Sequence, residues 1–211
     1  MRRGLLLLPL LAACSAVGVR SGTEEPAFTV LDGVGGVEVR QLGPRLLAEV
    51  EVEAEDEVAA RNAGFRPLAA YIFGRNQAAE RIGMTAPVTQ AGGERIGMTA
   101  PVSQSREGGR WRIGFVMPAR YSLATLPRPL DPAILVREAR AETVAVLRFA
   151  GAPSPERVAD AQARLAASLA ASAWEATGPG GAWFHDPPWT IPALRRNEAW
   201  LPVRRRQALP A

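Results

Sequence analysis

Hydrophobic and polar residues alternate along several short segments of the chain, a period of two that predicts β-strands. The first such segment, Val37–Leu42, is followed by Gly43 and Pro44 and then by residues 46–53, which continue the alternation. We expect these two strands to pair as a hairpin. Further strands are expected at residues 82–90, 95–104, 111–117, 134–139, 143–150, 182–185 and 197–203.

Two longer segments have the spacing of apolar residues that is typical of helices. Residues 56–73 form the first, where Gly64 and Pro67 are expected to start, kink or break the helix and Gly74 to end it. The second begins with Ser154, a good N-cap, and Pro155, which suits the first helical position. Its apolar stripe runs to about Trp174 through Val158, Ala161, Leu165, Leu169 and Ser172.

The predicted elements follow the order strand, strand, helix, strand, strand, and this order occurs twice. Such a duplication predicts an α+β domain with a pseudo-twofold axis. We expect a distorted antiparallel β-barrel with one flanking helix on each half.

One nonapeptide, Glu-Arg-Ile-Gly-Met-Thr-Ala-Pro-Val, occurs without change at residues 80–88 and 94–102. Many residues would satisfy the binary pattern at these positions, so the identity indicates either a specific surface or a recent tandem duplication. A loop of odd length between the copies would bury three pairs on one face of a hairpin: Met84 with Val102, Ala86 with Ala100 and Val88 with Met98. Pro87 and Pro101 have no N–H to donate, so these strands are expected at a sheet edge or at a bulge.

The composition suits one domain that needs no disulfide or metal, since 47% of its 211 residues are hydrophobic. All 25 basic residues are arginine, the net charge is +4, and most arginines are scattered among acidic residues. We therefore expect no nucleic-acid partner. The one basic cluster, Arg204–Arg205–Arg206, lies in a basic tail at residues 204–211, where a frayed, solvated end is favoured over a phosphate or lipid site.

The N-terminus has the features of an export signal: Arg2 and Arg3, an apolar run too short to cross a bilayer, and then Leu-Ala-Ala-Cys. This Leu-Ala-Ala-Cys segment resembles the lipobox of bacterial lipoproteins. The resemblance implies a signal peptide at residues 1–13 and a lipid on Cys14, the only cysteine. Residues 14–26 would form a tether and residues 27–203 the domain. Ser15 favours the outer membrane, and a soluble secreted protein is the alternative.

The sequence offers little for catalysis. His185 is the only histidine, so a Ser-His or Cys-His centre has one possible base, and no cluster has zinc-ligand spacing. The glycines at residues 33–36 precede a strand rather than a helix, unlike a phosphate-binding loop. We expect no catalytic residues, and a hydrolase or nucleotide enzyme is disfavoured.

Five segments together resemble the SOUL haem-binding protein family: Tyr71–Asn76, Met-Thr-Ala-Pro-Val, Phe115–Pro118, Pro187–Trp189 and Arg195–Glu198. The resemblance covers about residues 27–203. It implies a distorted barrel with two helices, and a haem or related tetrapyrrole held non-covalently, mainly by apolar contact.

The resemblance also implies a haem groove between the first helix and the loop before the last strand. The residues at matching positions are Phe65, Leu68, Ala69, Ile72, His185 and Trp189, with Arg66 and Arg75 as partners for the propionates. His185 is a possible iron ligand, although the family often has Tyr there. The helix residues fit equally well a helix packed on its sheet, and buried Arg–Glu pairing would explain Arg195–Glu198 as well as a ligand would.

These observations favour a monomeric, lipid-anchored protein on the periplasmic side of a bacterial envelope that stores, carries or scavenges haem or a related tetrapyrrole. Two alternatives remain open at this stage. One is haem turnover at a weakly ligated iron, and the other is a binding module for other amphipathic small molecules.

Overall fold

The computed structural model describes residues 23–77 and 94–207. The signal peptide, Cys14, most of the expected tether and the strand expected at 82–90 lie outside the described residues. So do the first nonapeptide copy and the end of the basic tail.

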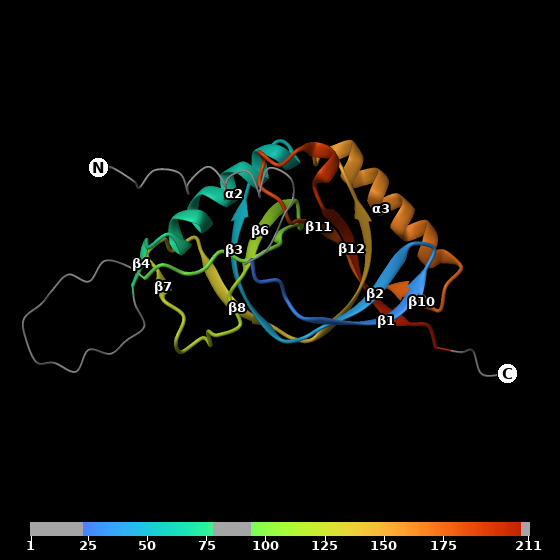
Figure 1. Cartoon of the computed structure of the whole chain (residues 1–211), viewed down its shortest axis with the longest axis horizontal. Helices are drawn as coiled ribbons and strands as arrows, with labels where there is room; N and C mark the ends of the chain where they lie inside the picture. Colours follow the sequence, from blue (N-terminus) through green and yellow to red (C-terminus); the bar gives the residue numbers. More distant parts are fainter. Residues whose placement is uncertain (1–22, 78–93, 208–211) are drawn as a thin grey trace, which may run out of the picture.

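The described residues form one large curled antiparallel sheet with two helices on its outer face (Figure 1). The helices are α2 (Glu57–Ile72) and α3 (Pro155–Ala170), and a short 3-10 helix, η1 (Pro192–Leu194), lies near the end. The first strands are β1 (Phe28–Val34), β2 (Val37–Leu42), β3 (Arg45–Val52), β4 (Asn76–Gln77), β5 (Val102–Glu107) and β6 (Arg110–Val116). The later strands are β7 (Arg128–Pro129), β8 (Leu135–Ala139), β9 (Glu142–Phe149), β10 (Trp174–Ala176), β11 (Gly181–Phe184) and β12 (Asn197–Arg205).

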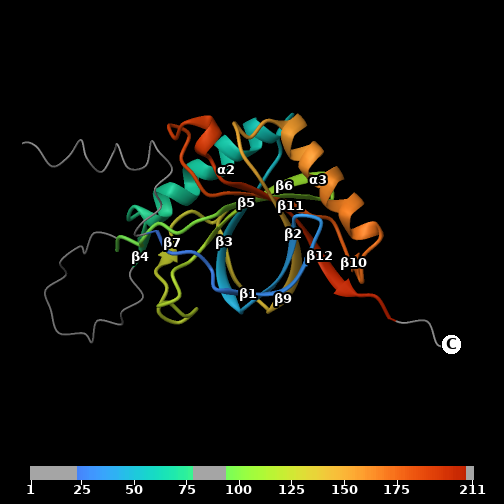
Figure 2. The ribbon, with the colours of Figure 1, turned by 45° about the vertical axis from the view of Figure 1, so that its right-hand side comes forward.

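The strand order confirms the expected duplication. The large sheet runs β1-β2-β9-β12-β11-β5-β6-β3-β8, with β10 beside β12. The two repeated units are β2-β3-α2-β5-β6 and β8-β9-α3-β11-β12, so β2 corresponds to β8, β3 to β9, β5 to β11 and β6 to β12. Apart from β1 and β10, each strand lies as far from one edge of the sheet as its counterpart lies from the other edge. A pseudo-twofold axis therefore passes between β11 and β5. The sheet curls into a half-barrel rather than a closed one, with β1 and β8 at its edges (Figure 2).

The expected hairpin of β2 and β3 is wrong. β2 pairs with β1 and β9, whereas β3 pairs with β6 and β8. The chain passes through Gly43 and Pro44 from one half of the sheet into the other, and the link between β8 and β9 does the same in the second unit. Alternation identifies a strand but not its partner, and β1 was missed because its residues are mostly exposed.

The helix α2 begins where Asp56 Oδ1 accepts hydrogen bonds from the backbone N–H groups of Val58 and Ala59, both at 2.8 Å. It continues through Gly64 and Pro67 without ending, and stops before Gly74, whose φ of +113° suits a glycine there. A Cβ at position 64 would lie 2.5 Å from Ile113 Cγ1, so the glycine lets the helix approach β6 closely.

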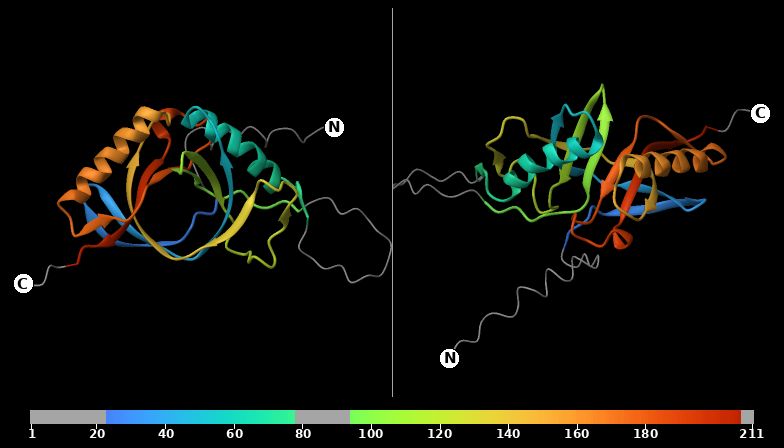
Figure 3. Two further views of the ribbon diagram at one scale, coloured as in Figure 1. Left: turned by 180° about the vertical axis from the view of Figure 1, so that it is seen from behind. Right: turned by 90° about the horizontal axis from the view of Figure 1, so that it is seen from above.

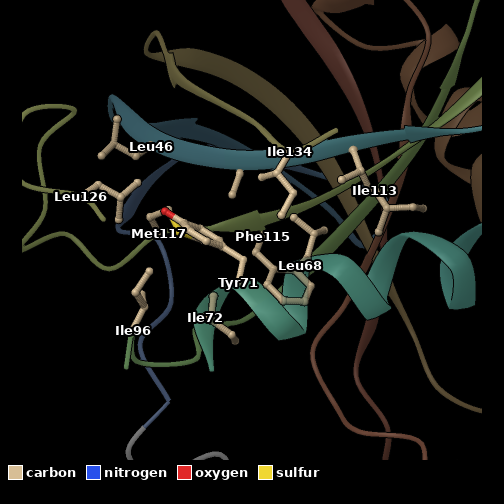
Figure 4. Packing of buried hydrophobic residues seen from close by; sticks show 12 residues of the cluster. Leu46, Leu68, Tyr71, Ile72, Ile96, Ile113, Phe115, Met117, Leu126 and Ile134 are labelled. Carbon is tan, nitrogen blue, oxygen red and sulfur yellow. The ribbon is translucent and has the colours of Figure 1, made fainter. Parts of the chain in front are cut away.

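Each helix covers one half of the sheet, as the view from above shows (Figure 3). The inner side of α2 packs with β3 and β6 around Leu68, Tyr71, Ile72, Ile113 and Phe115 (Figure 4). The stripe on α3 is buried as expected up to Leu169, with Ala161, Leu165 and Leu169 against β2, β9 and β12, but the helix ends at Ala170 and Trp174 begins β10.

The second nonapeptide copy is a strand only at its end. β5 starts at Val102, whose partners are Phe115 and Phe184 rather than Met84. Ile96 and Ala100 are buried, but Met98 is 49% exposed, so the expected burial of the paired residues on one face is wrong for Met98. The other halves of the expected pairs, Met84, Ala86 and Val88, lie outside the described residues.

The basic cluster is not a frayed end over its described part. β12 extends to Arg205 because β10 pairs with it from Trp174 to Ala176. Arg204 Nε lies 2.6 Å from Glu175 Oε1, and Arg206 Nε donates to the carbonyl of Ser172 at 3.1 Å.

We expect Gly64→Ala to lower the free energy of unfolding. Overpacking against Ile113 costs about 1–3 kcal/mol, which should outweigh the ~1 kcal/mol that alanine gains over glycine within a helix. Urea denaturation measures this, with Gly33→Ala as the control because no heavy atom lies within 4 Å of a Cβ there. A Gly64→Ala protein as stable as the parent would contradict the close approach of α2 to β6.

Candidate functional site

The inner, concave face of the half-barrel holds a cavity of about 300 Å³. Successive side chains of a strand point to opposite faces of the sheet. On β2, Val37 and Val39 therefore face α3, whereas Arg40 and Leu42 face the cavity. Six arginines and four glutamates line the cavity, an excess of two positive charges. A sheet with helices on one side would ordinarily leave such residues in water, but here the curl encloses them.

The most buried charge on this face is the carboxylate of Glu198, which is 1% exposed. Arg40 holds it in a two-point contact, with Nη1 3.0 Å from Oε2 and Nη2 3.2 Å from Oε1. His185 Nε2 lies 3.0 Å from the same Oε2. Since Arg40 belongs to β2 and Glu198 to β12, this ion pair joins the first unit to the second.

Burial alone would raise the pKa of Glu198, but its contacts with His185 and Arg40 lower that pKa to about 2. Burial is also the main reason that the pKa of His185 is lowered, against the opposing effect of Glu198. A neutral imidazole fits the geometry: Nε2–H donates to Glu198, while Nδ1 accepts from Arg196 Nη2 at 2.6 Å. Both ring nitrogens are therefore engaged.

The other half of the concave face has its own ion pair, in which the carboxylate is buried but the arginine side chain is 41% exposed. Glu49 of β3 is 6% exposed, and Arg137 of β8 contacts it with Nε at 2.6 Å from Oε2 and Nη2 at 3.1 Å from Oε1. By register, Arg137 is the pseudo-twofold counterpart of Arg40. The counterpart of Trp200 is Gly114, so the two halves of the cavity wall differ in bulk.

Two tryptophans form part of the apolar wall of the cavity. Trp183 of β11 and Trp200 of β12 stack with ring centroids 5.6 Å apart and an angle of 23° between the planes. Gly181 makes room for this pair, because a Cβ there would lie 2.9 Å from the ring of Trp200 and 2.2 Å from the carbonyl oxygen of Gln104.

The segment Glu24–Ala27, which we call the N-terminal strap, lies along one side of the cavity. The carbonyl of Glu24 accepts from Ala100 N at 2.9 Å, and its side chain accepts from Ala119 N at 2.7 Å. The carboxylate of Glu25 contacts Arg196 and lies 3.7 Å from His185 Nδ1. Residues 24–26, expected in the tether, are therefore bound to the domain. A second cavity, of about 580 Å³, lies next to the first, and Glu25 and Pro26 line both.

The helix residues of the predicted haem groove fall into two groups. Leu68 and Ile72 are at most 1% exposed and belong to the core between α2 and the sheet, so they present no surface to a ligand. Ala69 is half-buried, and Phe65, 39% exposed, touches Phe115 edge-on with one face left open. Arg66 and Arg75 are exposed.

The loop residues of the predicted groove are separated from one another. Trp189 is 67% exposed, whereas the side chain of His185 is 3% exposed and faces the concave cavity. Arg195 holds the loop by donating to the carbonyls of Thr190, at 2.8 Å, and Pro188. Burial is the main reason that the pKa of Arg61 is lowered, and the charge of Arg195 lowers it further. The loop thus lies beside the first half of α2, near Arg61, whereas Arg75 follows the end of the helix at Ile72.

Sequence reasoning missed the cavity residues Arg40, Glu49, Arg137, Trp183 and Trp200. The signal for part of them was present, because Arg196, Glu198 and Trp200 are two residues apart and must share one face of a strand. The expected Arg–Glu pairing of the Arg195–Glu198 segment is confirmed, but the closest arginine comes from β2. Within residues 23–77 and 94–207, the His, Cys, Asp and Glu side chains form no group of three suited to a metal ion. No helix in these ranges is long and apolar enough to span a membrane.

We expect the free energy of unfolding to fall as the pH drops from about 7.5 to about 5.5. The unfolded chain binds a proton at His185 below a pKa of about 6.5, and the folded chain does not, so acid favours unfolding. Urea titrations at both pH values measure the effect. His185→Gln keeps a donor to Glu198 and should abolish most of the difference; an equal pH dependence in the variant would contradict a neutral, buried His185.

We expect Glu198→Gln to destabilise the fold by about 3 kcal/mol, because it leaves the buried guanidinium of Arg40 without its main counter-charge. The double variant with Arg40→Met removes both charges and should be more stable than Glu198→Gln alone. Additive losses in thermal and urea unfolding would show that the two side chains do not act as a pair.

Comparison with known proteins supports the fold and the family. The family model for the SOUL heme-binding protein matches residues 23–202. No curated protein sequence is significantly similar to the chain.

Among solved structures, the C-terminal domain of EcmrR aligns with a TM-score of 0.57 and 11% identity, over 80% of this chain and 97% of that one. EcmrR in a complex with DNA aligns with a TM-score of 0.56 and 12% identity, over 80% of this chain and 57% of that one. A hydrolase from Listeria innocua aligns with a TM-score of 0.50 and 9% identity, over 82% of this chain and 94% of that one. At such low identities these matches show a shared fold. Since the family match extends over nearly all of the described domain, the chain belongs to the SOUL heme-binding protein family.

Proposed function

We propose that this protein binds haem or a related tetrapyrrole on the outer surface between α2 and the loop of residues 186–196. The observation that carries the proposal is the apolar surface left open there. Phe65 on the helix and Trp189, Ile191 and Leu194 on the loop are 39%, 67%, 49% and 47% exposed. Apolar side chains gathered on a surface commonly mark a binding site.

Charge on this surface also suits a tetrapyrrole. Arg61 and Arg195 lie close enough to affect one another, and guanidinium groups are good partners for propionates. Arg61 and Arg195 join Arg66 as our candidates, whereas Arg75 is set aside because it lies beyond the end of the helix at Ile72. Haem, when bound, would supply its iron and its redox chemistry.

The iron, in this proposal, has no ligand from His185. Its Nδ1 accepts from Arg196 and its Nε2 donates to Glu198, so neither nitrogen offers a free lone pair. His185 also faces the concave cavity rather than the outer surface. The tetrapyrrole would be held by apolar contact and by its propionates.

The anchor is a separate part of the proposal. A lipid on Cys14 would place the protein at the periplasmic side of a bacterial envelope, and the motif Leu11-Ala12-Ala13-Cys14 supports it. The role would be storage, carriage or scavenging of the tetrapyrrole.

We expect a hemin titration followed by absorbance to show saturable one-to-one binding. Trp189→Ala and Phe65→Ala should each weaken it about tenfold, by loss of roughly 1.4 kcal/mol of apolar burial. Leu123→Ala is the matched control, because Leu123 is also about half exposed but belongs to a different loop. Unchanged affinity in both aromatic variants would refute this site.

In the same titration, His185→Gln should leave the position of the Soret band unchanged, because the imidazole is not coordinated. A shifted band would mean that the Arg196–His185 contact opens and the iron takes the nitrogen.

For the anchor, Cys14→Ser should move the protein from the membrane fraction to the soluble fraction of the envelope. Fractionation and immunoblotting measure this, with Ser15→Ala as the control. A Cys14→Ser protein that stays with the membrane would contradict lipidation.

A further inference from the structure

We propose that the concave cavity is a second binding site, for a small aromatic carboxylate, and that Glu25 of the N-terminal strap fills its carboxylate subsite when no ligand is bound. This site is distinct from the outer surface proposed for the tetrapyrrole. A cavity of about 300 Å³ is at the small end of the range for ligand sites, so it suits one or two fused rings.

The carboxylate subsite is formed by Arg196 and His185. Arg196 is 18% exposed and reaches Glu25 through Nη2, the same atom that donates to His185 Nδ1. Glu198 fixes the pair from behind, because its Oε2 lies 3.0 Å from His185 Nε2 and its Oε1 lies 3.5 Å from Arg196 Nε. The charge of Glu198 is itself matched by Arg40. Arg196 is therefore held in place with a carboxylate in front of it.

The carboxylate that contacts Arg196 from the cavity side belongs to Glu25, which is not part of the sheet. Glu25 belongs to the strap, which contributes to neither repeated unit, and its side chain is 27% exposed. It provides one of the four acidic side chains of the cavity. If Glu25 moves away, six arginines face three glutamates, and the cavity favours an anion more strongly.

The aromatic part of the ligand would lie against Trp183 and Trp200. Trp183 pairs with Glu198 across the two strands, and Trp200 follows Glu198 by two residues on the same face of β12. The tryptophans therefore begin about 7 Å beyond Arg196 along the strand. Aromatic rings stack favourably on such a pair.

The strap would control access. Glu25 and Pro26 of the strap, together with Arg45 and Val116, line both the concave cavity and the larger cavity of about 580 Å³ beside it. A ligand carboxylate that replaces Glu25 on Arg196 would join the two cavities by displacing the strap. Competition by Glu25 lowers the apparent affinity, since only the fraction of molecules with an open subsite can bind.

Isothermal titration calorimetry of the full chain with 2-naphthoate tests this inference, and neutral 2-naphthamide is the control ligand. We expect one-to-one binding of the carboxylate and binding of the amide that is at least about tenfold weaker. Arg196→Gln should weaken naphthoate binding by about tenfold, whereas Arg164→Gln, a matched change on the exposed face of α3, should not affect it.

The decisive variant is Glu25→Ala, which should bind naphthoate about threefold or more tightly because it removes the competing carboxylate. Glu175→Ala, which breaks an exposed pair with Arg204, is its control. Naphthoate binding no tighter in Glu25→Ala than in the parent would show that Glu25 does not compete for Arg196. Circular dichroism establishes that each variant is folded.

Three results would overturn the inference: no naphthoate binding to either the parent or Glu25→Ala, equal binding of naphthamide, or naphthoate binding unaffected by Arg196→Gln. None of them bears on hemin binding. Conversely, Trp189→Ala should weaken hemin and leave naphthoate unchanged, so failure of one site is distinguishable from failure of the other.

Discussion

The rest of this structure depends on one constraint: each repeated unit gives its first strand to the other half of the sheet. β2 is joined to β3 by only Gly43 and Pro44, yet its partner across the sheet is β9 of the second unit. In the same way, β8 of the second unit pairs with β3 of the first. With both units tied in this way, neither half has a complete sheet on its own. The shared sheet is curled, and the curl gives it an inner face.

The two faces of the sheet carry different kinds of side chain. The outer face is apolar and is covered by α2 and α3, where Gly64 permits close packing. The inner face carries the buried pair Arg40–Glu198 and the partly buried pair Arg137–Glu49, each of which joins strands from different units. Buried ion pairs add little net stability, because desolvation offsets the attraction, but a mispaired sheet would leave these charges alone at a large cost. The pairs therefore favour the exchanged arrangement over a simple hairpin.

The division also separates the two proposed ligand surfaces. On the outside, aromatic side chains and arginines at the junction of α2 and the 186–196 loop suit a large, flat, weakly held molecule. On the inside, a fixed Arg196–His185 pair and stacked tryptophans suit a small anion. His185 takes part only in the inner surface, where it positions Arg196.

The sequence predicted the elements better than their partners. Alternation at Val37–Leu42, the N-cap Ser154 and Gly74 identified a strand and two helix ends, because these signals are local. The β2–β9 pairing depends on contacts about 100 residues apart, for which the sequence holds no local signal. Alternation at Val37–Leu42 implies that Arg40 lies on the polar side of its strand, but only the curl of the sheet shows that this side is enclosed. Leu68 and Ile72 were assigned to a groove because they match positions of the SOUL family's groove, although their apolar spacing fits a helix packed on its sheet equally well.

The central claim is that the protein has two independent sites on opposite faces of one sheet. A hemin titration at saturating 2-naphthoate tests it most directly. Independent sites predict the same hemin affinity with and without naphthoate, because coupling between two ligands must be reciprocal and here should be absent. A hemin affinity that falls in proportion to the naphthoate concentration would mean that both ligands occupy one site, and would contradict the account.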